Sequence, residues 1–570
     1  MTRHDETPAA TSKASMTGTA APGVFAAAGL IAVLTLVARV VGFGRWLVFS
    51  QSVGTTCVGS VYQAANQLPN VIFEVAAGGA LAAVVVPIIA GQLARPNSGA
   101  TQNSAEAAQT ASAMLTWTLA VLVPLSILMA ASARPLASFM VDDQRCSGST
   151  DLMASMIVVF SPQIALYGVG IVLAGVLQAH RRFLGVVLAP LLSSLVVMAA
   201  YLMFGALAQG KGNDLARLPS RASMALALGT TLGVAVLSLS LLIPVHRAGV
   251  RLRPTWTFPD GVARRASALA GAGLLALFAQ QVAVLVTLWV SQHRGGTGTL
   301  NVYVYVQAIY LLPYAVLAVP FAMSALPALA TGLDQAVLAT APVQASFARA
   351  QSTLASSARA IIVATSAGAA VLFAIASPTG AFFSALDAGR HNPHGIAALA
   401  ALPGALSAFA PGLVGFGMAA LLTRALYVQG RPAVAGGLVA LGWFIAAIVP
   451  LLVLQSDAGP RSTLIALGLA SSLGMTVAAL GLFVAVRRTW GVKAFRGFGR
   501  SAVVACGAAL FSAAVGRGLA AVLHPQGLVA GAVVAALVAV VVAMLFAGSI
   551  WIGDRGSARL ALAKLPGRAR

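Results

Sequence analysis

The sequence predicts an all-α polytopic membrane protein with about 14 transmembrane helices, arranged as two six-helix bundles and two further C-terminal helices. Three observations lead to this fold class. Of the 570 residues, 59% are hydrophobic and only 8% are charged, whereas soluble domains carry about 25% charged residues. Apolar runs of about 20 residues, long enough to cross a bilayer, recur along the chain. Prolines repeat at matching places in its two halves.

The first lobe is expected to span residues 24–246. It follows a stretch at 1–23 that is polar and rich in Ala, Thr and Ser, which we interpret as a disordered cytoplasmic tail. The apolar run after this tail is longer than that of a signal peptide and continues into Arg39, so it is predicted to be a retained first helix. The expected spanning segments of this lobe are 24–52, 61–93, 110–133, 152–179, 183–208 and 222–246.

The second lobe is expected to span residues 266–486, followed by a pair of helices within 499–552 and a basic cytoplasmic tail at 553–570. Each apolar run is again long enough to cross the membrane. The expected segments are 266–291, 299–331, 355–376, 395–428, 433–455 and 462–486, and then 499–522 and 527–552.

A weak internal repeat relates the two lobes. The second segment contains Pro69 and later Pro87, and the eighth segment contains Pro313 and later Pro327. We therefore predict two bundles of the same topology, related by a pseudo-two-fold axis along the membrane normal, as in parallel-repeat transporters. Pro69 and Pro313 are expected to bend their helices.

Basic residues set the predicted orientation. An even number of spans puts both termini on one side. On that side fall 24 of the 35 lysines and arginines, among them Arg424 and Arg431 at helix ends, against 9 on the other, with Arg39 and Arg45 left over. By the positive-inside rule both termini are cytoplasmic, in a multi-pass protein that we assign to the bacterial cytoplasmic membrane. The net charge of +22 therefore reflects topology, and no nucleic-acid partner is expected.

Two arginines and one glutamate lie inside apolar spans. Arg39 and Arg45 belong to the first segment and Glu74 to the second. A charge at the bilayer centre costs at least roughly 2.5 kcal/mol, so such residues face a wet cavity or one another. The two arginines predict an anionic guest. The alternatives are that Arg45 snorkels to the interface, and that Glu74 is a structural counter-ion for Arg39 rather than an ion-pair gate or a protonatable switch.

The spacing of the arginines requires a helix bend if both are to bind one guest. Six residues on a straight α-helix correspond to about 240° around the axis, so Arg39 and Arg45 would face different ways. Gly42 and Gly44 lie between them, and glycines are recognised sites of helix bending. We expect a bend at these glycines to bring both guanidinium groups to one cavity.

Amide side chains form a polar stripe on the second segment. Gln63, Asn66, Gln67 and Asn70 recur at three- and four-residue spacing, which places them on one helix face. Such a stripe either lines a cavity or joins helices through hydrogen bonds. Gln307 is expected to add a neutral hydrogen-bond partner from the eighth segment. Weaker candidates on the facing lobe are Gln280, Gln281, Tyr303 and Tyr305.

The sequence predicts neither an enzyme nor a cofactor site. It contains no phosphate-binding P-loop and no Ser/His/Asp set within one segment. Cys57, Cys146 and Cys506 are far apart and lack ligand spacing, so we expect no disulfide framework and no metal site, and we interpret them as packing residues. His391 and His394 form an isolated loop pair that is not expected to bind a metal.

Several stretches resemble the MurJ (MviN-type) lipid II flippases of the multidrug/oligosaccharidyl-lipid/polysaccharide exporter superfamily, particularly their actinobacterial branch. Most of the resemblance lies in ARVVGFGRWLVFSQSVG and NQLPNVIFEVAAGGALAAVVVPII, with further matches in LQAHRRF, LLPYAVLAVP and LTRALYVQGRPAV. The resemblance implies that the chain moves the undecaprenyl-diphosphate-linked peptidoglycan precursor from the inner to the outer leaflet by alternating access. Arg39 and Arg45 match the family's two arginines in this segment, which implies that they bind the diphosphate.

Some basic positions of the family are absent from this chain. Phe73 and Glu74 stand where basic residues are expected, and Ala308 stands where the eighth segment often carries an arginine. Two alternatives therefore remain: a sister exporter of another lipid-linked saccharide or small molecule, and a transport-silent membrane scaffold for cell-wall synthesis. The expected partners are the lipid-linked precursor, the surrounding membrane lipids and, for the scaffold, cell-wall synthesis proteins.

Overall fold

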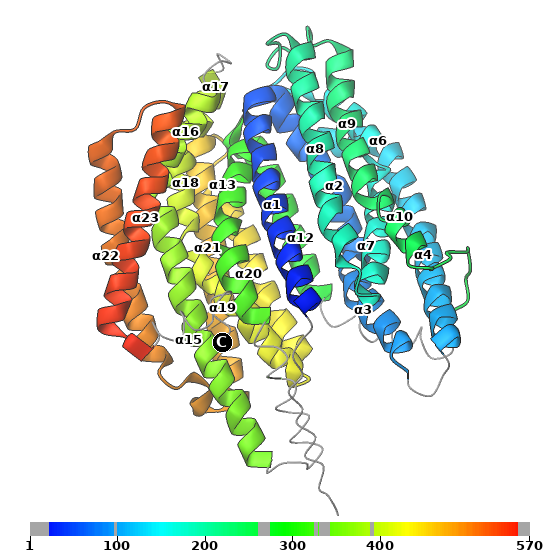
Figure 1. Ribbon diagram of the computed structural model, residues 1–570. Coiled ribbons are helices and arrows are strands. Elements are labelled where there is room, and N and C mark those ends of the chain that lie inside the picture. Colours follow the sequence, from blue (N-terminus) through cyan, green and yellow to red (C-terminus); the bar gives the residue numbers. More distant parts are fainter. Residues whose placement is uncertain are drawn as a thin grey trace, which may run out of the picture.

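The computed structural model describes residues 22–95, 100–259, 274–323, 329, 343–387 and 393–556. Within these ranges the chain is helical and contains no β-strand, which confirms the predicted all-α class. Two groups of helices stand side by side in Figure 1, the first coloured blue to blue-green and the second green to red. The predicted tails at 1–23 and 553–570 lie almost entirely outside the described residues.

The first group of helices, here called the N-lobe, begins with α1. The next helix, α2, starts where the Thr56 hydroxyl accepts a hydrogen bond of 3.1 Å from the Gly59 N–H, which satisfies one free amide of the first turn. The elements of the N-lobe are α1 (Pro22–Ser52), α2 (Cys57–Phe73), the π-helical turn η1 (Glu74–Gly78), α3 (Gly79–Leu93), α4 (Ala100–Ala131), α5 (Ala133–Met140), α6 (Ser149–Phe160), α7 (Gln163–Ala179), α8 (Phe183–Ala208), α9 (Ser220–Leu239) and α10 (Leu242–Arg247).

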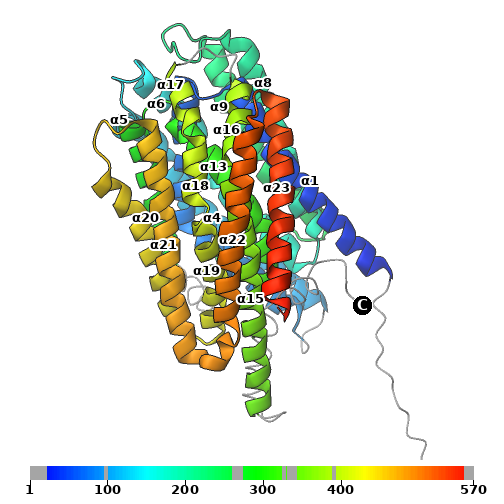
Figure 2. The same ribbon diagram turned by 90° about the vertical axis from the view of Figure 1, so that its left-hand side faces the viewer.

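The second group, here called the C-lobe, ends in α22 and α23, which pack on the outside of the lobe against α15 and α16 (Figure 2). Its elements are α12 (Leu274–Val290), the π-helical turn η3 (Ser291–Gly295), α13 (Thr299–Pro313), the π-helical turn η4 (Tyr314–Ala318), α15 (Val343–Ala374), α16 (Ala376–Asp387), α17 (Pro393–Ala400), α18 (Leu402–Phe409), α19 (Gly412–Val428), α20 (Pro432–Val453), α21 (Gly459–Trp490), the short 3₁₀-helix η6 (Val492–Phe495), α22 (Phe498–Leu523) and α23 (Leu528–Gly553).

The described part of the chain contains 11 helices that are long and apolar enough to cross a membrane, or up to 12 if one bent pair counts as a single span. The bent pair corresponds to the predicted segment 395–428. The helical stretch that ends at Phe409 and the helix α19 that follows it are bent by 46° relative to each other. Pro411 stands at this break, where a proline removes a helical amide. The first two predicted segments are helical, as α1 and as α2 to α3, but they are not among the 12. The predicted count of 14 spans is therefore not confirmed.

The predicted proline repeat coincides with a structural irregularity in both lobes. In the N-lobe, the helix that contains Pro69 passes into the π-helical turn η1 at Glu74. In the C-lobe, α13 ends at Pro313 and passes directly into the π-helical turn η4. Because π-turns are rare and mark places where a helix changes course, their occurrence in both lobes agrees with two related bundles.

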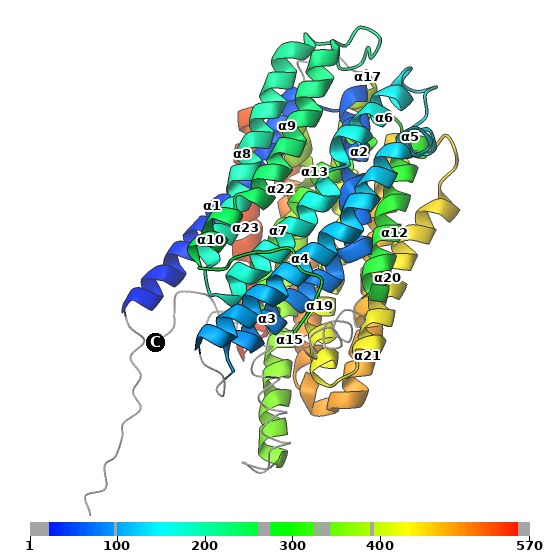
Figure 3. The same cartoon turned by 90° about the vertical axis from the view of Figure 1, so that its right-hand side faces the viewer.

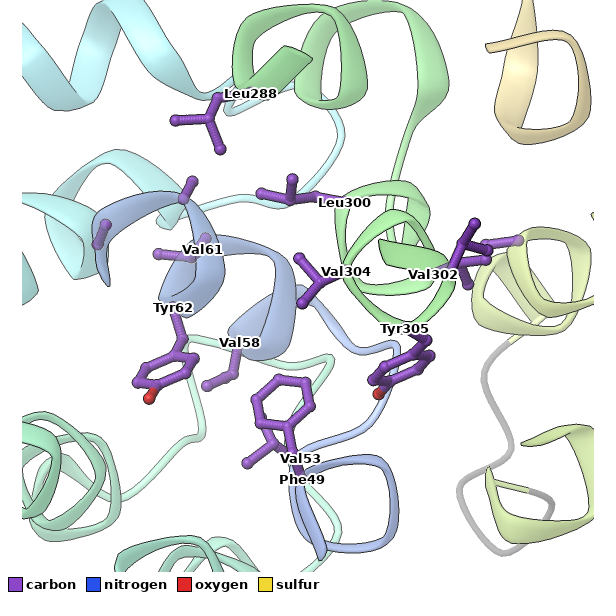
Figure 4. Close-up of a cluster of buried hydrophobic side chains, with 14 of the residues drawn as sticks. Phe49, Val53, Val58, Val61, Tyr62, Leu288, Leu300, Val302, Val304 and Tyr305 are labelled. Atoms are coloured by element: carbon purple, nitrogen blue, oxygen red, sulfur yellow. The ribbon is translucent and has the colours of Figure 1, made fainter. Parts of the chain in front are cut away.

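Buried aromatic rings join the two lobes in a group that we call the aromatic seal: Phe49, Tyr62, Tyr201 and Tyr305. Figure 4 shows Phe49, Tyr62 and Tyr305 of this group. Phe49 on α1 stacks on Tyr62 of α2 at 5.7 Å between ring centroids, and it meets Tyr305 of α13 edge-on at 6.2 Å. The Tyr62 hydroxyl shares a hydrogen bond of 3.0 Å with the Tyr201 hydroxyl. The seal therefore combines apolar contact with a satisfied buried polar group.

A disulfide joins Cys57 and Cys146, so the prediction that both are merely packing residues was wrong. Cys57 begins α2 and Cys146 lies in the loop between α5 and α6, 89 residues later. The prediction failed because sequence spacing does not show which loops meet in space. We call this end of the molecule, which also holds residues 53–56 and 295–298, the disulfide end. The third cysteine, Cys506, is free and exposed.

Close backbone contact holds α20 and α21 together. A Cβ added at Gly474 would overlap the carbonyl oxygen of Gly442 on the facing helix, and one added at Gly442 would overlap the Gly474 carbonyl in return. Small residues of this kind allow membrane helices to approach closely and to gain dispersion energy. These two helices also form one wall of a cavity in the C-lobe.

Candidate functional site

A cavity of about 620 Å³ lies within the C-lobe and is closed on one side by the N-lobe. The C-lobe contributes residues from α12, α13, α19, α20 and α21, and the N-lobe contributes Trp46 of α1 with Gln67 and Asn70 of α2. Helices α2 and α13 both begin near the disulfide end. Along most of each helix, the residues that line the cavity follow those of the aromatic seal, and so lie further from that end. The cavity therefore extends from the middle of the helices towards the opposite end of the molecule.

Among the described residues that line the cavity, one side chain is cationic, Arg424 of α19. Its guanidinium donates hydrogen bonds to the Ala420 carbonyl oxygen at 2.5 Å and to the Met323 sulfur at 3.4 Å. None of the ion pairs in the described part of the chain includes Arg424, and no acidic residue lines the cavity. A guanidinium carries five donors in a planar fork, so Arg424 retains donors and a full positive charge for a guest.

Arg424 was not predicted as a site residue. It is close to the end of the predicted segment 395–428, so its charge was assigned to the cytoplasmic connection that follows. Helix α19 continues to Val428, so Arg424 lies one turn inside the helix. Arg424 nevertheless shares the feature that marked Arg39, since both are arginines inside an apolar span.

Three of the predicted amide residues line the cavity: Gln67, Asn70 and Gln307. Gln307 donates a hydrogen bond of 3.1 Å to the Tyr303 hydroxyl, which also lines the cavity. The other polar or aromatic lining residues that are described, apart from Arg424, are Trp46, Gln280, Gln281, Thr287, Tyr310, Tyr314, Phe416, Thr423, Tyr427, Trp443 and Ser471. This lining offers neutral hydrogen-bond donors and acceptors beside flat aromatic rings. Tyr305, a weaker candidate, belongs instead to the aromatic seal.

The other two members of the predicted stripe lie nearer the disulfide end and do not line the cavity. Gln63 is 1% exposed, and its amide nitrogen has no hydrogen-bond partner among the described residues. The side-chain oxygen of the half-buried Asn66 is likewise without a partner in that part of the chain. Unsatisfied buried polar atoms carry a free-energy cost, so both amides are available for a hydrogen bond that this conformation does not supply.

Arg39 and Arg45 face different surroundings. Arg39 is exposed, whereas Arg45 is half-buried with its guanidinium carbon 5.1 Å from the centroid of the Trp46 ring. The Arg45 Nε is buried and has no hydrogen-bond partner in the described ranges. Helix α1 is continuous through Gly42 and Gly44, and neither Arg39 nor Arg45 is among the described residues that line the C-lobe cavity. The bend that would bring both guanidinium groups to one cavity stays a prediction.

Glu74 begins the π-helical turn η1 and is half-buried. Its carboxylate folds back onto Gly78, where an added Cβ would overlap a carboxylate oxygen. None of the four ion pairs between described residues includes Glu74, Arg39 or Arg45, so the expected ion pair is not formed in this conformation. Of the histidine pair, His391 and the His394 side chain lie outside the described residues.

The lobes are joined at the disulfide end by hydrogen bonds that we call the latch. The Asn301 amide donates to the Gly54 carbonyl at 2.7 Å, and the Gly298 N–H donates to the Ser60 hydroxyl at 2.8 Å. Arg145 donates to the His293 carbonyl at 2.6 Å, next to the disulfide. The latch and the aromatic seal together close the interface between the lobes at this end.

The loop that carries Arg145 is itself fixed to α6. The Asp143 carboxylate accepts hydrogen bonds from the Ser149 hydroxyl at 2.7 Å and from the Thr150 N–H at 2.8 Å. These bonds stabilise the charged carboxylate and hold the pKa of Asp143 below its usual range. The interaction also places a negative charge at the N-terminus of α6, where the helix dipole favours it.

Comparison with known proteins gives a family and a fold. A family model described as lipid II flippase MurJ matches residues 49–551. A solved structure described as lipid II flippase MurJ in an inward closed conformation has a TM-score of 0.69 at 16% identity, covering 92% of this chain and 99% of that chain. An inward-facing multidrug resistance MATE family transporter has a TM-score of 0.59 at 15% identity, covering 80% of this chain and 94% of that chain.

A transporter of the MOP superfamily from Pyrococcus furiosus has a TM-score of 0.51 at 15% identity, covering 81% of this chain and 92% of that chain. At these identities the similarity to solved structures shows the fold. The family model covers most of the sequence, including the helices that form the cavity, the seal and the latch. The chain therefore belongs to the lipid II flippase MurJ family.

Proposed function

We propose that this chain flips lipid II by admitting its headgroup to the C-lobe cavity, where Arg424 binds the diphosphate. The undecaprenyl tail of lipid II prefers the bilayer, whereas the diphosphate, the sugars and the peptide do not. A polar cavity lowers the barrier because charged and polar groups then cross without entering hydrocarbon.

The observation that carries this proposal is the uncompensated charge of Arg424. A guanidinium forms forked, charge-assisted hydrogen bonds with phosphate oxygens, and these bonds are about twice as strong as neutral ones. The lining residues that are described include no acid, which supports an anionic guest over a cationic drug. Arg424 supplies a cation near Ala308, where the family often carries an arginine and this chain does not.

Neutral lining residues are proposed to recognise the rest of the headgroup. Gln67, Asn70 and Gln307 offer amide groups for sugar hydroxyls, and the lining aromatic rings offer flat surfaces for sugar rings. Arg39 and Arg45 are proposed to meet the diphosphate as the lobes rearrange. The unpartnered Nε of Arg45 supports this role, because a bound phosphate would satisfy it. Glu74 is proposed as an ion-pair partner for these arginines in another conformation.

We further propose that the disulfide end faces outwards and that both termini are cytoplasmic, in the bacterial inner membrane. The positive-inside count supports this orientation. The disulfide gives independent support, because structural disulfides persist on the oxidising side of a bacterial membrane and are rare in the cytosol. Cys57 and Cys146 lie in the first and third connections, which the charge count also places outside.

Complementation of flippase-depleted cells tests the role of Arg424. We expect Arg424→Ala to lose rescue at normal expression, because no other lining residue among those described is cationic, and we expect Arg424→Lys to retain part of it. Arg431→Ala is the matched control, since Arg431 is exposed and follows the same helix. Full rescue by Arg424→Ala would remove the proposed diphosphate site. Failure of the wild-type chain would instead favour the sister exporter or the scaffold.

A further inference from the structure

The segment that leaves the N-lobe, residues 249–258, runs as an extended strap along α4 (Figure 3). Its backbone is fixed to hydroxyl groups one helical turn apart on α4. The Arg253 N–H donates to the Ser112 hydroxyl at 3.1 Å, and the Thr255 N–H donates to the Thr116 hydroxyl at 3.1 Å. The path of the strap is therefore set by specific bonds, although it forms no helix.

A pair of tryptophans forms a second attachment between the strap and α4. Trp117 of α4 donates from its ring N–H to the Trp256 carbonyl at 3.1 Å, and the two rings meet edge-on at 5.2 Å. The rings nevertheless remain exposed, at 47% for Trp117 and 59% for Trp256. Exposed tryptophans beside a membrane-spanning helix are typical of the headgroup level of a bilayer, where the ring is amphipathic like its surroundings.

The arginines of the strap point away from the protein. Successive residues of an extended chain alternate between its two faces. Val250 is buried and Leu252 packs against the N-lobe core, so Arg251 and Arg253 occupy the outer face and are exposed.

Further arginines lie at the start of the strap. Arg182, in the preceding connection on the same side, donates a hydrogen bond of 2.9 Å to the Arg247 carbonyl, which places it at the end of α10. The side chains of Arg181, Arg182 and Arg247 are all exposed. None of the ion pairs found in the described ranges involves these residues or the two strap arginines.

We propose that the strap is a binding site for the headgroup of an anionic phospholipid in the cytoplasmic leaflet. Arg251 and Arg253 offer guanidinium forks to the lipid phosphate, and Trp117 and Trp256 insert at headgroup level beside them. The charges are complementary, because anionic leaflets attract basic segments close to a membrane span. The site lies on α4, which contributes nothing to the cavity, so it is separate from the lipid II route. The leaflet assignment rests on the proposed orientation.

Lipid-specific quenching of Trp256 fluorescence tests the site. The full-length protein is placed in vesicles with brominated phosphatidylglycerol or with brominated phosphatidylcholine at the same mole fraction. The difference between the wild-type chain and Trp256→Phe isolates the Trp256 signal. We expect phosphatidylglycerol to be enriched beside Trp256 by at least about fivefold, which corresponds to one engaged arginine.

A charge-matched pair of variants gives the control. Arg251→Gln with Arg253→Gln should abolish the preference for phosphatidylglycerol. Arg487→Gln with Arg488→Gln removes the same charge from exposed positions at the end of α21, in the other lobe, and should leave the preference unchanged. Equal quenching of the wild-type chain by both lipids would overturn the proposal, as would an equal loss of preference in both double variants. The readout does not require flipping, so it is independent of the proposed role of Arg424.

Discussion

Arg145 of the N-lobe donates a hydrogen bond of 2.6 Å to the main-chain carbonyl oxygen of His293 in the C-lobe. Its Nε also lies 3.6 Å from the Asp142 carboxylate, which holds the side chain in place. The neighbouring residue, Cys146, is tied to α2 by the disulfide. This arrangement makes Arg145 a direct link between the lobes at the disulfide end, which the proposed orientation places outside.

Replacing Arg145 by alanine should favour opening at the disulfide end. The lost hydrogen bond is worth about 1 kcal/mol for a partly exposed donor, which corresponds to about fivefold in the closed-to-open ratio. The measurement introduces a cysteine at the buried position Val61 (Val61→Cys) and records how fast an impermeant maleimide labels it in cells. The protein also carries Cys506→Ser, so that the free cysteine does not react.

The control for this prediction is Arg134→Ala. Arg134 forms an exposed ion pair with Asp151 and contributes nothing to the latch, so labelling should stay at the wild-type rate. Equal labelling of the Arg145→Ala and wild-type proteins would show that the hydrogen bond to His293 does not hold the lobes closed.

Removing the disulfide should lower the thermal stability of the purified protein. A cross-link between residues 89 positions apart restricts the unfolded chain, and its loss typically costs about 2–4 kcal/mol. Cys146→Ser should unfold at a lower temperature than the wild-type protein, and reductant should lower the wild-type transition to the same value. Cys506→Ser, which affects a free thiol, is the control. The disulfide would be contradicted if reductant left the unfolding temperature of the wild-type protein unchanged and free thiols were found at positions 57 and 146.

Substituting Gly474 by alanine should destabilise the C-lobe. The added methyl group meets the Gly442 carbonyl on α20, and overpacking of this kind costs about 1–3 kcal/mol. Gly437→Ala on α20 is the matched control, because no atom lies within 4 Å of a Cβ at that position. This control should be neutral or slightly stabilising, since alanine favours a helix over glycine. Thermal unfolding in detergent measures both variants, and equal midpoints would contradict the close contact.

The stabilising effect of Asp143 should depend on pH. Its pKa is lowered in the folded protein by bonds from Ser149 and Thr150, so its contribution is present above the unfolded pKa and is lost as the pH falls through the folded value. The unfolding temperature of the wild-type protein should exceed that of Asp143→Asn above about pH 5. The difference should shrink as the pH falls below the unfolded value for an aspartate, about 3.9. A constant difference across this range would show that the charge of Asp143 is not responsible.

Local features of the sequence predicted much of the helical framework. The apolar runs predicted the membrane helices, and the prolines at 69 and 313 coincided with helices that pass into π-helical turns. The three-and-four spacing of amides on α2 placed Gln67 and Asn70 on the face that lines the cavity. These features are local, because helix periodicity and hydropathy depend on residues close in sequence.

The contacts between distant segments could not be predicted in this way. The disulfide joins the start of α2 to the loop between α5 and α6, and their proximity depends on how these helices pack. Arg39 and Arg45 have different surroundings, since Arg39 is exposed and Arg45 is half-buried beside Trp46. Arg424 was assigned to a connection because its distance from the end of α19 depends on where that helix stops.

The sequence by itself determined that the chain crosses a membrane many times, that its two halves are related, and that it resembles the MurJ family. Hydropathy, proline placement and charge carry this information along the chain. Only the tertiary structure decided which arginine lines the cavity, which cysteines pair, and where the strap lies on α4. Each of these depends on the packing of helices from distant parts of the chain, and that packing is set by shape and burial in three dimensions.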